Sequence, residues 1–235
     1  MTDDTSPVFA YHSRPSMIDF PGRLAAIFFT AGCSFRCGFC HNAELLGRRK
    51  TGLRWSRLES ACVHFHKNWV DGVVISGGEP TCFEGELIRL IRFFRQYGFA
   101  IKLDTNGSRP DVLEEVLPLV DYVAMDIKCA LGRYAEFVGF ADADKIARSI
   151  ELLKTATVAG EFRTTVVEGL HGEEEIAEIG ALLAGAKQYV LQPFLPRQDL
   201  PDPEFRTRPR TSPAFLKKLV ANLAKFDLTV QVRGA

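Results

Sequence analysis

The chain has 235 residues, 46% of them hydrophobic and 25% charged, which is enough for one sizeable hydrophobic core. Its 29 basic residues balance its 29 acidic residues, so no net charge attracts the protein to nucleic acid or to an anionic membrane. We therefore expect neither a nucleic-acid partner nor a membrane partner.

The start of the chain predicts a cytoplasmic protein. Its first five residues, Met1-Thr2-Asp3-Asp4-Thr5, are acidic and polar, unlike the basic start of a signal peptide. No apolar run approaches the length of a membrane span. In a reducing compartment the six cysteines are expected to be ligands or buried small side chains rather than disulfides.

Short apolar runs alternate with amphipathic runs along the chain, which is the pattern of repeated β-α units around a parallel sheet. Strands are expected at 24–29, 72–75, 100–104, 122–126, 161–167, 188–191 and 228–232. Helices are expected at 56–67, 87–94, 111–117, 146–153, 173–183 and 213–226, the last with Ser212 as its N-cap.

These six β-α units and a closing strand predict an α/β fold with parallel strands, arranged as a partial (β/α)6 TIM-like barrel. We expect one domain over residues 1–235. Within it, 1–23 form an N-terminal extension and 24–192 the barrel core. Residues 193–235 supply a proline- and arginine-rich loop, the last helix and the terminal strand.

The connection from Pro196 to Pro213 is rich in proline and arginine, which argues against a helix or a central strand there. The favoured interpretation is a solvated connection that tethers the last helix. A docking or lid segment for a partner is the alternative, because long loops are sometimes functional.

Three cysteines follow the first expected strand of the barrel core. Cys33, Cys37 and Cys40 have the spacing CxxxCxxC, which supplies three thiolate ligands. An iron-sulfur cluster of four irons held by three thiolates keeps one iron without a protein ligand, so a small molecule can bind there and receive an electron. The spacing therefore points to redox chemistry at an open iron.

A zinc site or a disulfide is the alternative for these cysteines. A structural zinc site has four protein ligands, usually in two CxxC-like pairs, and disulfide frameworks belong to short secreted chains. His41 could supply a fourth ligand, but its position directly after Cys40 is unfavourable. Neither alternative suits the spacing well.

Other polar and glycine-rich segments also follow expected strands. Ser76-Gly77-Gly78-Glu79-Pro80 follows the second strand, Asp104-Thr105-Asn106-Gly107 ends the third and Asp126-Ile127-Lys128 ends the fourth. Each alone could be ordinary turn or cap chemistry. The carboxyl ends of parallel strands share one face of a barrel, so together these segments predict one active site.

These segments resemble those of the radical S-adenosylmethionine (SAM) superfamily. The cysteine loop matches its signature, including the aromatic Phe39 before the last cysteine. More narrowly, Cys40-His41-Asn42 and the three segments after strands resemble glycyl radical enzyme activases. The runs at 16–22, 162–167 and 230–234 resemble the anaerobic ribonucleoside-triphosphate reductase activating proteins.

The resemblance implies two cofactors, a four-iron, four-sulfur (4Fe-4S) cluster on Cys33, Cys37 and Cys40 and SAM chelated to its open iron. An electron from the cluster would cleave SAM and give a 5′-deoxyadenosyl radical. The SAM-binding residues implied are Phe39, Gly77, Gly78, Glu79, Asp104, Thr105, Asn106, Asp126, Lys128 and Arg163.

Individual roles follow from the same resemblance. Gly77, Gly78 and Glu79 would bind the methionine ammonium, Asp104 the ribose hydroxyls, and Phe39 the adenine. Arg163 would pair with the SAM carboxylate, although a structural ion pair is equally expected. A monovalent cation could bind Asp104, Thr105 and Asp126. Cys62 is expected to be a thiol of the hydrophobic core, and Cys82 and Cys129 are expected to be small side chains in loops.

The implied substrate is a glycine of a partner glycyl radical enzyme, with an anaerobic ribonucleotide reductase favoured. A radical SAM enzyme acting on a small molecule, similar to 7-carboxy-7-deazaguanine synthase, is the alternative. The implied electron donor is a flavodoxin or ferredoxin, which the basic run Arg48-Arg49-Lys50 could attract, although such runs are more often solvated surface.

Overall fold

The computed structural model describes residues 4–46 and 51–234, and it divides into two compact units that we take in turn. The first unit comprises Met1–Ser34, Glu44–Thr105 and Asp111–Val123, and the second comprises Phe35–Ala43, Asn106–Pro110 and Ala124–Ala235. The single domain expected from the sequence stays a prediction. No helix of the described residues is long and apolar enough to cross a lipid bilayer.

The sheet of the first unit has the order β1-β2-β3-β4. Its strands are β1 (Val8–Tyr11), β2 (Ala25–Thr30), β3 (Gly72–Gly77) and β4 (Ala100–Thr105). The parallel pairs begin with Ala25 opposite Gly72 and Gly72 opposite Ala100. The strands predicted at 24–29, 72–75 and 100–104 are thus confirmed.

Strand β1 was missed, and it pairs antiparallel with β2. Its run Val8-Phe9-Ala10-Tyr11 is apolar but has only four residues, and only Val8 is buried. Periodicity does not assign so short a run to a strand.

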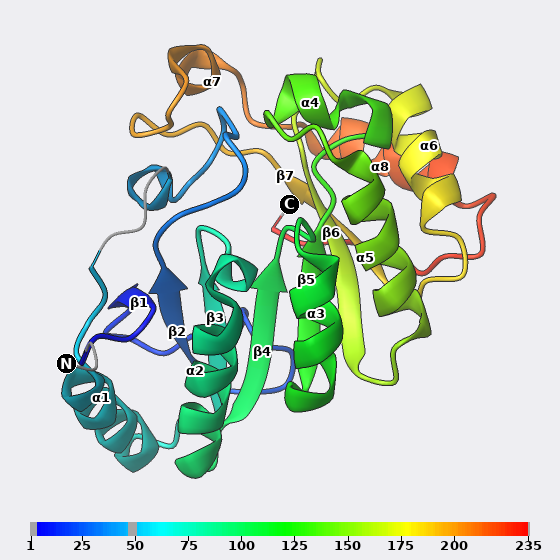
Figure 1. The fold of residues 1–235 in the computed structure, drawn as a ribbon. Coiled ribbons are helices and arrows are strands. Elements are labelled where there is room, and N and C mark those ends of the chain that lie inside the picture. The colour runs from blue at the N-terminus through cyan, green and yellow to red at the C-terminus, as the bar shows by residue number, and fades with distance from the viewer. Residues whose placement is uncertain (1–3, 47–50, 235) are drawn as a thin grey trace. The chain divides into compact units, whose positions relative to one another are not determined.

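Helices of the first unit cover the sheet. They are α1 (Trp55–Lys67), α2 (Glu84–Gln96) and α3 (Pro110–Val116), with one-turn helices η1 (Ala43–Leu45), η2 (Pro80–Phe83) and η3 (Leu117–Leu119). The buried ring of Phe28 on β2 contacts Phe94 of α2 at 4.6 Å and Phe65 of α1 at 6.1 Å between ring centroids. The contact with Phe94 forms because the buried face of α2 carries apolar residues at helical spacing. In Figure 1, α2 lies in front of β3.

The second unit continues with β5 (Tyr122–Asp126), which starts in the first unit, and then β6 (Ala159–Val166), β7 (Tyr189–Pro193) and β8 (Val230–Val232). The order is β5-β6-β7-β8, and the β6-β7 and β7-β8 pairs are parallel. The predicted strands at 122–126, 161–167, 188–191 and 228–232 are therefore confirmed within a few residues, and with them the α/β class with parallel strands.

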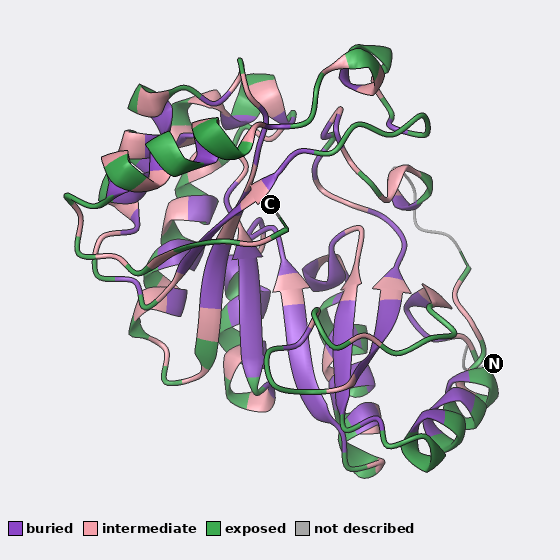
Figure 2. Ribbon diagram, turned by 180° about the vertical axis from the view of Figure 1, so that it is seen from behind, coloured by how far each residue is buried: buried purple, intermediate pink, exposed green. Residues whose placement is uncertain are grey.

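Helices α5 (Ala143–Thr155), α6 (Glu173–Leu182) and α8 (Pro213–Leu223) confirm the predicted helices of the second unit. Ser212 caps α8 as expected, because its hydroxyl accepts the Phe215 amide at 3.2 Å. Buried faces of these helices and strands are purple in Figure 2, and their outer faces are green. Short helices η4 (Leu131–Arg133) and α4 (Tyr134–Phe137) follow β5.

The expectation that proline excludes a helix from 196–213 was wrong. The helix α7 (Pro203–Thr207) forms there, with Pro203 in its first turn and Asp202 as its N-cap. Proline is tolerated in the first helical turn because the amides of that turn have no partner inside the helix.

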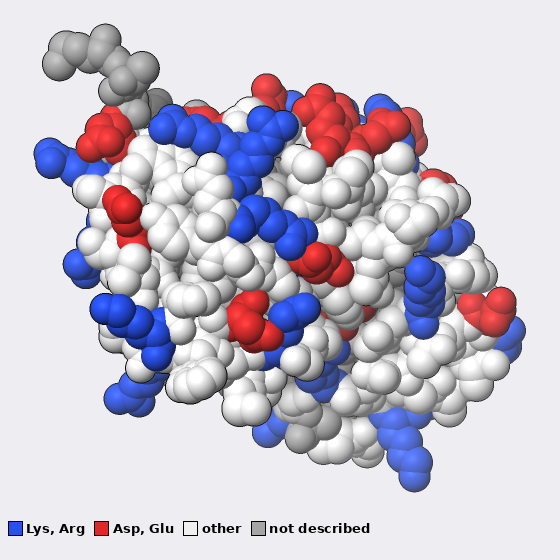
Figure 3. Space-filling model, turned by 90° about the horizontal axis from the view of Figure 1, so that it is seen from below, with Lys and Arg blue, Asp and Glu red and all other residues white. Residues whose placement is uncertain are grey.

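The surface carries both signs of charge. On the face shown in Figure 3, Lys and Arg side chains are interspersed with Asp and Glu, and neither sign covers the face. This agrees with the equal numbers of acidic and basic residues in the sequence.

Candidate active site

In the first unit, the glycine segment after β3 packs against the end of β2 and the residues that precede Cys33. The Gly78 amide donates to the Thr30 carbonyl at 2.9 Å, and the Glu79 amide donates to the Gly32 carbonyl at 2.9 Å. A Cβ on Gly78 would lie 2.1 Å from the Gly32 oxygen, and one on Gly77 would lie 2.3 Å from the Thr30 oxygen. Both positions therefore require glycine, and Gly77 also has a φ of 125°.

Glu79 is fully buried, and its carboxylate organises the start of η2. One oxygen, Oε1, accepts the Thr81 amide at 3.0 Å, the Thr81 hydroxyl at 2.6 Å and the Thr105 hydroxyl at 2.8 Å. Two of the predicted SAM-binding residues, Glu79 and Thr105, are thus in direct contact. Thr81 joins them, and the sequence analysis did not identify it.

Asp104 ends β4 beside a buried lysine. Its Oδ1 accepts Lys102 Nζ at 2.6 Å and its Oδ2 accepts the Ser76 hydroxyl at 3.2 Å. Lys102 is 2% exposed, which is rare for a lysine without a paired charge. Neither Lys102 nor Ser76 was predicted as a site residue, although a lysine two positions before an aspartate in an otherwise apolar strand was a usable signal.

In the second unit, Asp126 at the end of β5 lies between two cations. Its Oδ1 accepts Arg163 Nε and its Oδ2 accepts Lys128 Nζ, both at 2.8 Å. Burial opposes ionisation of Asp126, but the charges of Arg163 and Lys128 outweigh it and hold the pKa of this carboxyl below its usual range. The structure thus brings the three predicted residues Asp126, Lys128 and Arg163 into one ion-pair cluster.

The backbone of Lys128 is held from two sides. Its amide donates to the Tyr134 hydroxyl at 3.1 Å, and its carbonyl lies 2.8 Å from His171 Nε2. Because His171 Nδ1 accepts the Val167 amide, the proton of the neutral ring is on Nε2, which donates to Lys128. Burial lowers the pKa of His171, which favours this neutral form. The sequence analysis missed both Tyr134 and His171.

Cys37 and Cys40 share one turn of the second unit, in which the Cys40 amide donates to the Cys37 carbonyl at 3.3 Å. Burial raises the pKa of the Cys37 thiol to about 11, although the charge of Lys128 acts in the opposite direction. Cys33 belongs to the first unit. None of the six cysteines, all of which lie in the described residues, forms a disulfide, and Cys62 and Cys129 are buried while Cys82 is half-buried.

As the side chains are placed, the described residues contain no group of three His, Cys, Asp or Glu that could hold a metal ion. The chemistry of the donor set nevertheless fits an iron-sulfur cluster, since three thiols that form no disulfide, with CxxxCxxC spacing, supply the soft ligands that such clusters use.

Two further predicted residues have local partners in the second unit. Phe39 is buried, and its ring contacts those of Phe137 at 5.4 Å and Phe205 at 5.6 Å. Asn106 accepts the Ser108 amide at 3.0 Å and so shapes the turn after β4. The basic run Arg48-Arg49-Lys50 lies outside the described residues.

Comparisons with known proteins show the family of this chain. The model of the radical SAM superfamily matches residues 27–183. The putative glycyl-radical enzyme activating enzyme MJ1227 of Methanocaldococcus jannaschii is 35% identical over 225 residues, which cover 93% of this chain and 92% of the relative. The 7-carboxy-7-deazaguanine synthase of Thermococcus kodakarensis is 27% identical, over 74% of this chain and 76% of the relative.

Among solved structures, Streptococcus suis SuiB bound to S-adenosylmethionine matches with a TM-score of 0.67 at 15% identity. The match covers 89% of this chain and 52% of SuiB, so the chain spans about half the length of that protein. This likeness concerns the fold, and it is consistent with the predicted partial TIM-like barrel. Family membership implies an iron-sulfur cluster and SAM as cofactors. The chain is an enzyme that belongs to the radical SAM superfamily and, within it, to the family of glycyl-radical enzyme activating enzymes.

Proposed function

We propose that this enzyme generates a glycyl radical on a partner protein, and that the partner is an anaerobic ribonucleoside-triphosphate reductase. The observation that carries the proposal is the cysteine triad Cys33, Cys37 and Cys40, in a chain that resembles a glycyl-radical enzyme activating enzyme over nearly its whole length. The specific partner rests on the runs at 16–22, 162–167 and 230–234, which resemble the reductase activating proteins.

The three cysteines would hold a 4Fe-4S cluster as thiolates. When bound, the cluster supplies one electron that breaks the S–C5′ bond of SAM, giving methionine and a 5′-deoxyadenosyl radical that takes a hydrogen atom from a glycine Cα. Burial raises the pKa of both the Cys37 and the Cys40 thiol, and the charge of Lys128 partly opposes this effect, in the direction of the thiolate form that iron requires.

On the first unit, the segment Gly77–Glu79 and the residues Asp104 and Thr105 would bind SAM. Their hydrogen bonds to Thr30, Gly32, Ser76 and Lys102 hold these backbone and carboxylate acceptors in fixed positions. Acceptors suit the ammonium and the ribose hydroxyls of SAM. Fixed acceptors bind with a smaller entropy loss than mobile ones.

On the second unit, Arg163 and Lys128 would bind the SAM carboxylate, while Asn106 would shape the nearby turn. Both cations already pair with Asp126, which fixes their orientation. The ring of Phe39 is packed against other rings, so its backbone is the part that suits adenine. A monovalent cation at Asp104, Thr105 and Asp126 remains a prediction. The two aspartates already pair with Lys102 and Lys128, with which the cation would compete.

The electron would come from a flavodoxin or a ferredoxin.

A second candidate function is radical chemistry on a small molecule, which the similarity to a 7-carboxy-7-deazaguanine synthase favours. The relative that carries the activase proposal is similar over more of the chain, 93% against 74%. The two functions differ in what SAM cleavage requires, namely a glycyl radical protein or a small metabolite.

Two substitutions test the assignment of the cofactor sites. Cys37→Ala removes one of three cluster ligands, so anaerobic reconstitution should yield no stable cluster and no 5′-deoxyadenosine. Asp104→Asn keeps the size of the side chain but removes the charge that pairs with Lys102. It should retain iron and sulfide while weakening SAM binding by roughly tenfold, about the loss of one charged hydrogen bond.

Iron and sulfide content, equilibrium SAM binding and 5′-deoxyadenosine release would be measured for each variant. Asp71→Asn is the matched control, because its exposed ion pair with Arg23 lies at the starts of β2 and β3, whereas Asp104 lies at the end of β4. A Cys37→Ala protein that still cleaved SAM would contradict the cluster assignment, and unchanged SAM affinity in Asp104→Asn would remove Asp104 from the binding site.

A further inference from the structure

Residues 195–208, which we name the strap, lie against the loop that carries Cys37 and Cys40. The Asp202 amide donates to the Gly38 carbonyl at 3.1 Å, and the Leu195 carbonyl lies 3.1 Å from His41 Nε2. Both contacts belong to the second unit. The strap thus contacts the loop on both sides of Phe39, in positions that bracket Cys40.

Gly38 is the closest point of approach between the strap and the loop. A Cβ at this position would lie 2.8 Å from Phe205 Cε2 and 2.9 Å from Asp202 Cβ. Neither atom is the end of a flexible side chain. Because Cβ contacts under 3.0 Å essentially never occur, only glycine allows the strap to pack this closely between Cys37 and Cys40.

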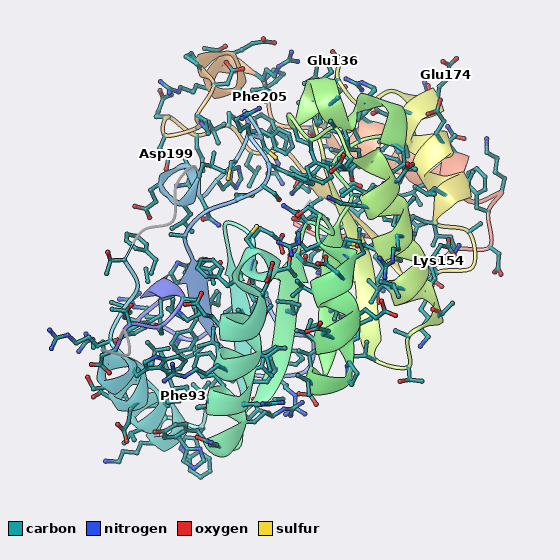
Figure 4. The ribbon with its side chains drawn as sticks, viewed as in Figure 1. Phe93, Glu136, Lys154, Glu174, Asp199 and Phe205 are labelled. Carbon is teal, nitrogen blue, oxygen red and sulfur yellow. The ribbon has the colours of Figure 1, made fainter. Side chains whose placement is uncertain are left out.

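Phe205 fills the space that the missing side chain leaves. It is 8% exposed, and its ring contacts that of Phe39 at 5.6 Å and that of Phe194 at 5.9 Å. Figure 4 labels Phe205 on α7 and Asp199 on the preceding turn of the strap. Aromatic contacts of this kind stabilise by more than their buried area alone.

The strap has its own internal bonds, so its contacts with the loop have fixed positions. Asp202 caps α7 by accepting the Glu204 amide at 2.9 Å, and Arg206 Nε donates to the Leu200 carbonyl at 2.8 Å. Leu200 is fully buried. Glu204 also pairs with Arg208, whose guanidinium lies over the Phe205 ring at 5.5 Å.

A pocket of about 480 Å3 lies beside these contacts, and Gly38 and Phe205 are among the residues that line it. Phe39 is not among them. Phe205 and Phe137 both line this pocket and contact Phe39, at 5.6 Å and 5.4 Å between ring centroids, so their rings lie between the pocket and the residue next to Cys40.

We infer that the strap positions the cluster-binding loop and limits solvent access to the cluster. Phe205 and Asp202 are the positioning residues. They act through Gly38 and Phe39 and so fix Cys37 and Cys40. The inference rests on the proposed function, because it assumes that these cysteines hold a cluster. It assigns a role to the proline- and arginine-rich segment that a simple tether for α8 would not have.

The test compares iron retention in reconstituted wild-type protein, Phe205→Ala, Gly38→Ala and the double variant. Each protein is loaded with iron and sulfide without oxygen, and the release of iron to bathophenanthroline is followed by its colour. Phe205→Ala should release iron roughly tenfold faster, the low end of the range for residues that support metal ligands. Gly38→Ala should do the same, because its new Cβ displaces Phe205.

The double variant separates positioning from general destabilisation. Removing the Phe205 ring relieves the closest contact of a Cβ at position 38 and leaves the contact with Asp202 Cβ at 2.9 Å. The double variant should therefore release iron by a smaller factor than the product of the two single effects. Effects that multiply would contradict the inference, because contacting residues that act through one another are not additive. Phe226→Ala, which removes a ring packed on Gly180 in α6, is the matched control and should retain iron as the wild type does.

The electron paramagnetic resonance spectrum and the reduction potential of the cluster provide a readout that a tether would not affect. We expect a changed spectrum and a higher potential in Phe205→Ala, since added solvent stabilises the more negative reduced cluster. In Phe205→Leu the spectrum and the reduction potential should lie between those of the wild type and Phe205→Ala. This variant replaces Phe205→Ala in the test if the alanine variant does not fold.

The outcomes separate the two claims. Wild-type iron retention, spectrum and potential in Phe205→Ala, or in Phe205→Leu if only that variant folds, would overturn the role of the strap and leave the proposed function standing. A wild-type protein that assembled no cluster would overturn both.

Discussion

Several residues predicted to bind SAM also hold the protein's own structure together. Gly78 permits two backbone segments to approach, and Glu79 accepts three hydrogen bonds from Thr81 and Thr105. Asp104 neutralises the buried Lys102. At these positions, loss of activity in a variant therefore has two causes that must be separated, damage to the fold and loss of a ligand contact.

Gly78→Ala tests the structural part of this claim. The added Cβ would lie 2.1 Å from the Gly32 oxygen, and this is a backbone atom that cannot move aside cheaply. We expect the free energy of unfolding, measured by urea denaturation, to fall by about 1–3 kcal/mol, as is usual for overpacking.

Gly85→Ala is the matched control for this prediction. It has no atom within 4 Å of a built Cβ and lies in α2, so the substitution should change stability by at most about 1 kcal/mol, in the stabilising direction. If Gly78→Ala and Gly85→Ala were equally stable, the close approach would carry no energetic weight.

At the scale of elements, an ion pair between a half-buried arginine and a buried glutamate joins the residue after the last strand to β6. Arg233 donates to both carboxylate oxygens of Glu161 at 2.7 Å, and Glu161 is 1% exposed. Between them lies β7, which receives the Arg233 amide at the Leu191 carbonyl. The two parallel hydrogen bonds of this ion pair hold the C-terminal strand in place more precisely than the backbone hydrogen bonds of its three residues would alone.

Arg233→Ala should therefore destabilise the protein strongly. It removes both hydrogen bonds of Arg233 to the buried Glu161 carboxylate, which should lower the unfolding free energy by about 2–3 kcal/mol, less than for a fully buried pair because Arg233 is partly exposed. Chemical denaturation would measure the loss. The double change Glu161→Leu with Arg233→Leu should recover most of it, because apolar residues often replace a buried ion pair without cost.

Arg197→Ala is the control for an exposed ion pair. Arg197 and Asp199 are half exposed, and such pairs contribute little, so the change should stay within about 0.5 kcal/mol. Equal effects of Arg197→Ala and Arg233→Ala would contradict the view that β8 is held by the ion pair of Arg233 and Glu161.

At the scale of the whole molecule, the sequence predicted seven parallel strands and the segments that follow them, because buried parallel strands are continuous apolar runs. It did not predict β1, which has only four residues, or α7, in which Pro203 occupies a permitted position in the first turn. The cysteine triad stays a prediction, and the predicted residues Asp126, Lys128 and Arg163 lie in one ion-pair cluster. Tyr134 and His171 were not predicted, because their partners belong to the backbone, and Lys102 was not predicted although its partner Asp104 is two positions away.

The remaining question for the whole molecule is what it acts on. The activase proposal makes the substrate a glycine of another protein, whereas the alternative makes it a small molecule. Both share the cysteine triad and the SAM-binding residues, so assays of cluster content or SAM cleavage alone do not separate them.

The most direct test adds an anaerobic ribonucleotide reductase to the reconstituted, reduced protein with SAM and records the electron paramagnetic resonance spectrum. The account predicts a glycyl radical doublet on the added reductase, formed together with 5′-deoxyadenosine and absent with Cys37→Ala. Formation of 5′-deoxyadenosine without a glycyl radical on the reductase would contradict the proposed partner, and absence of both cluster and cleavage in the wild type would contradict the activase proposal itself.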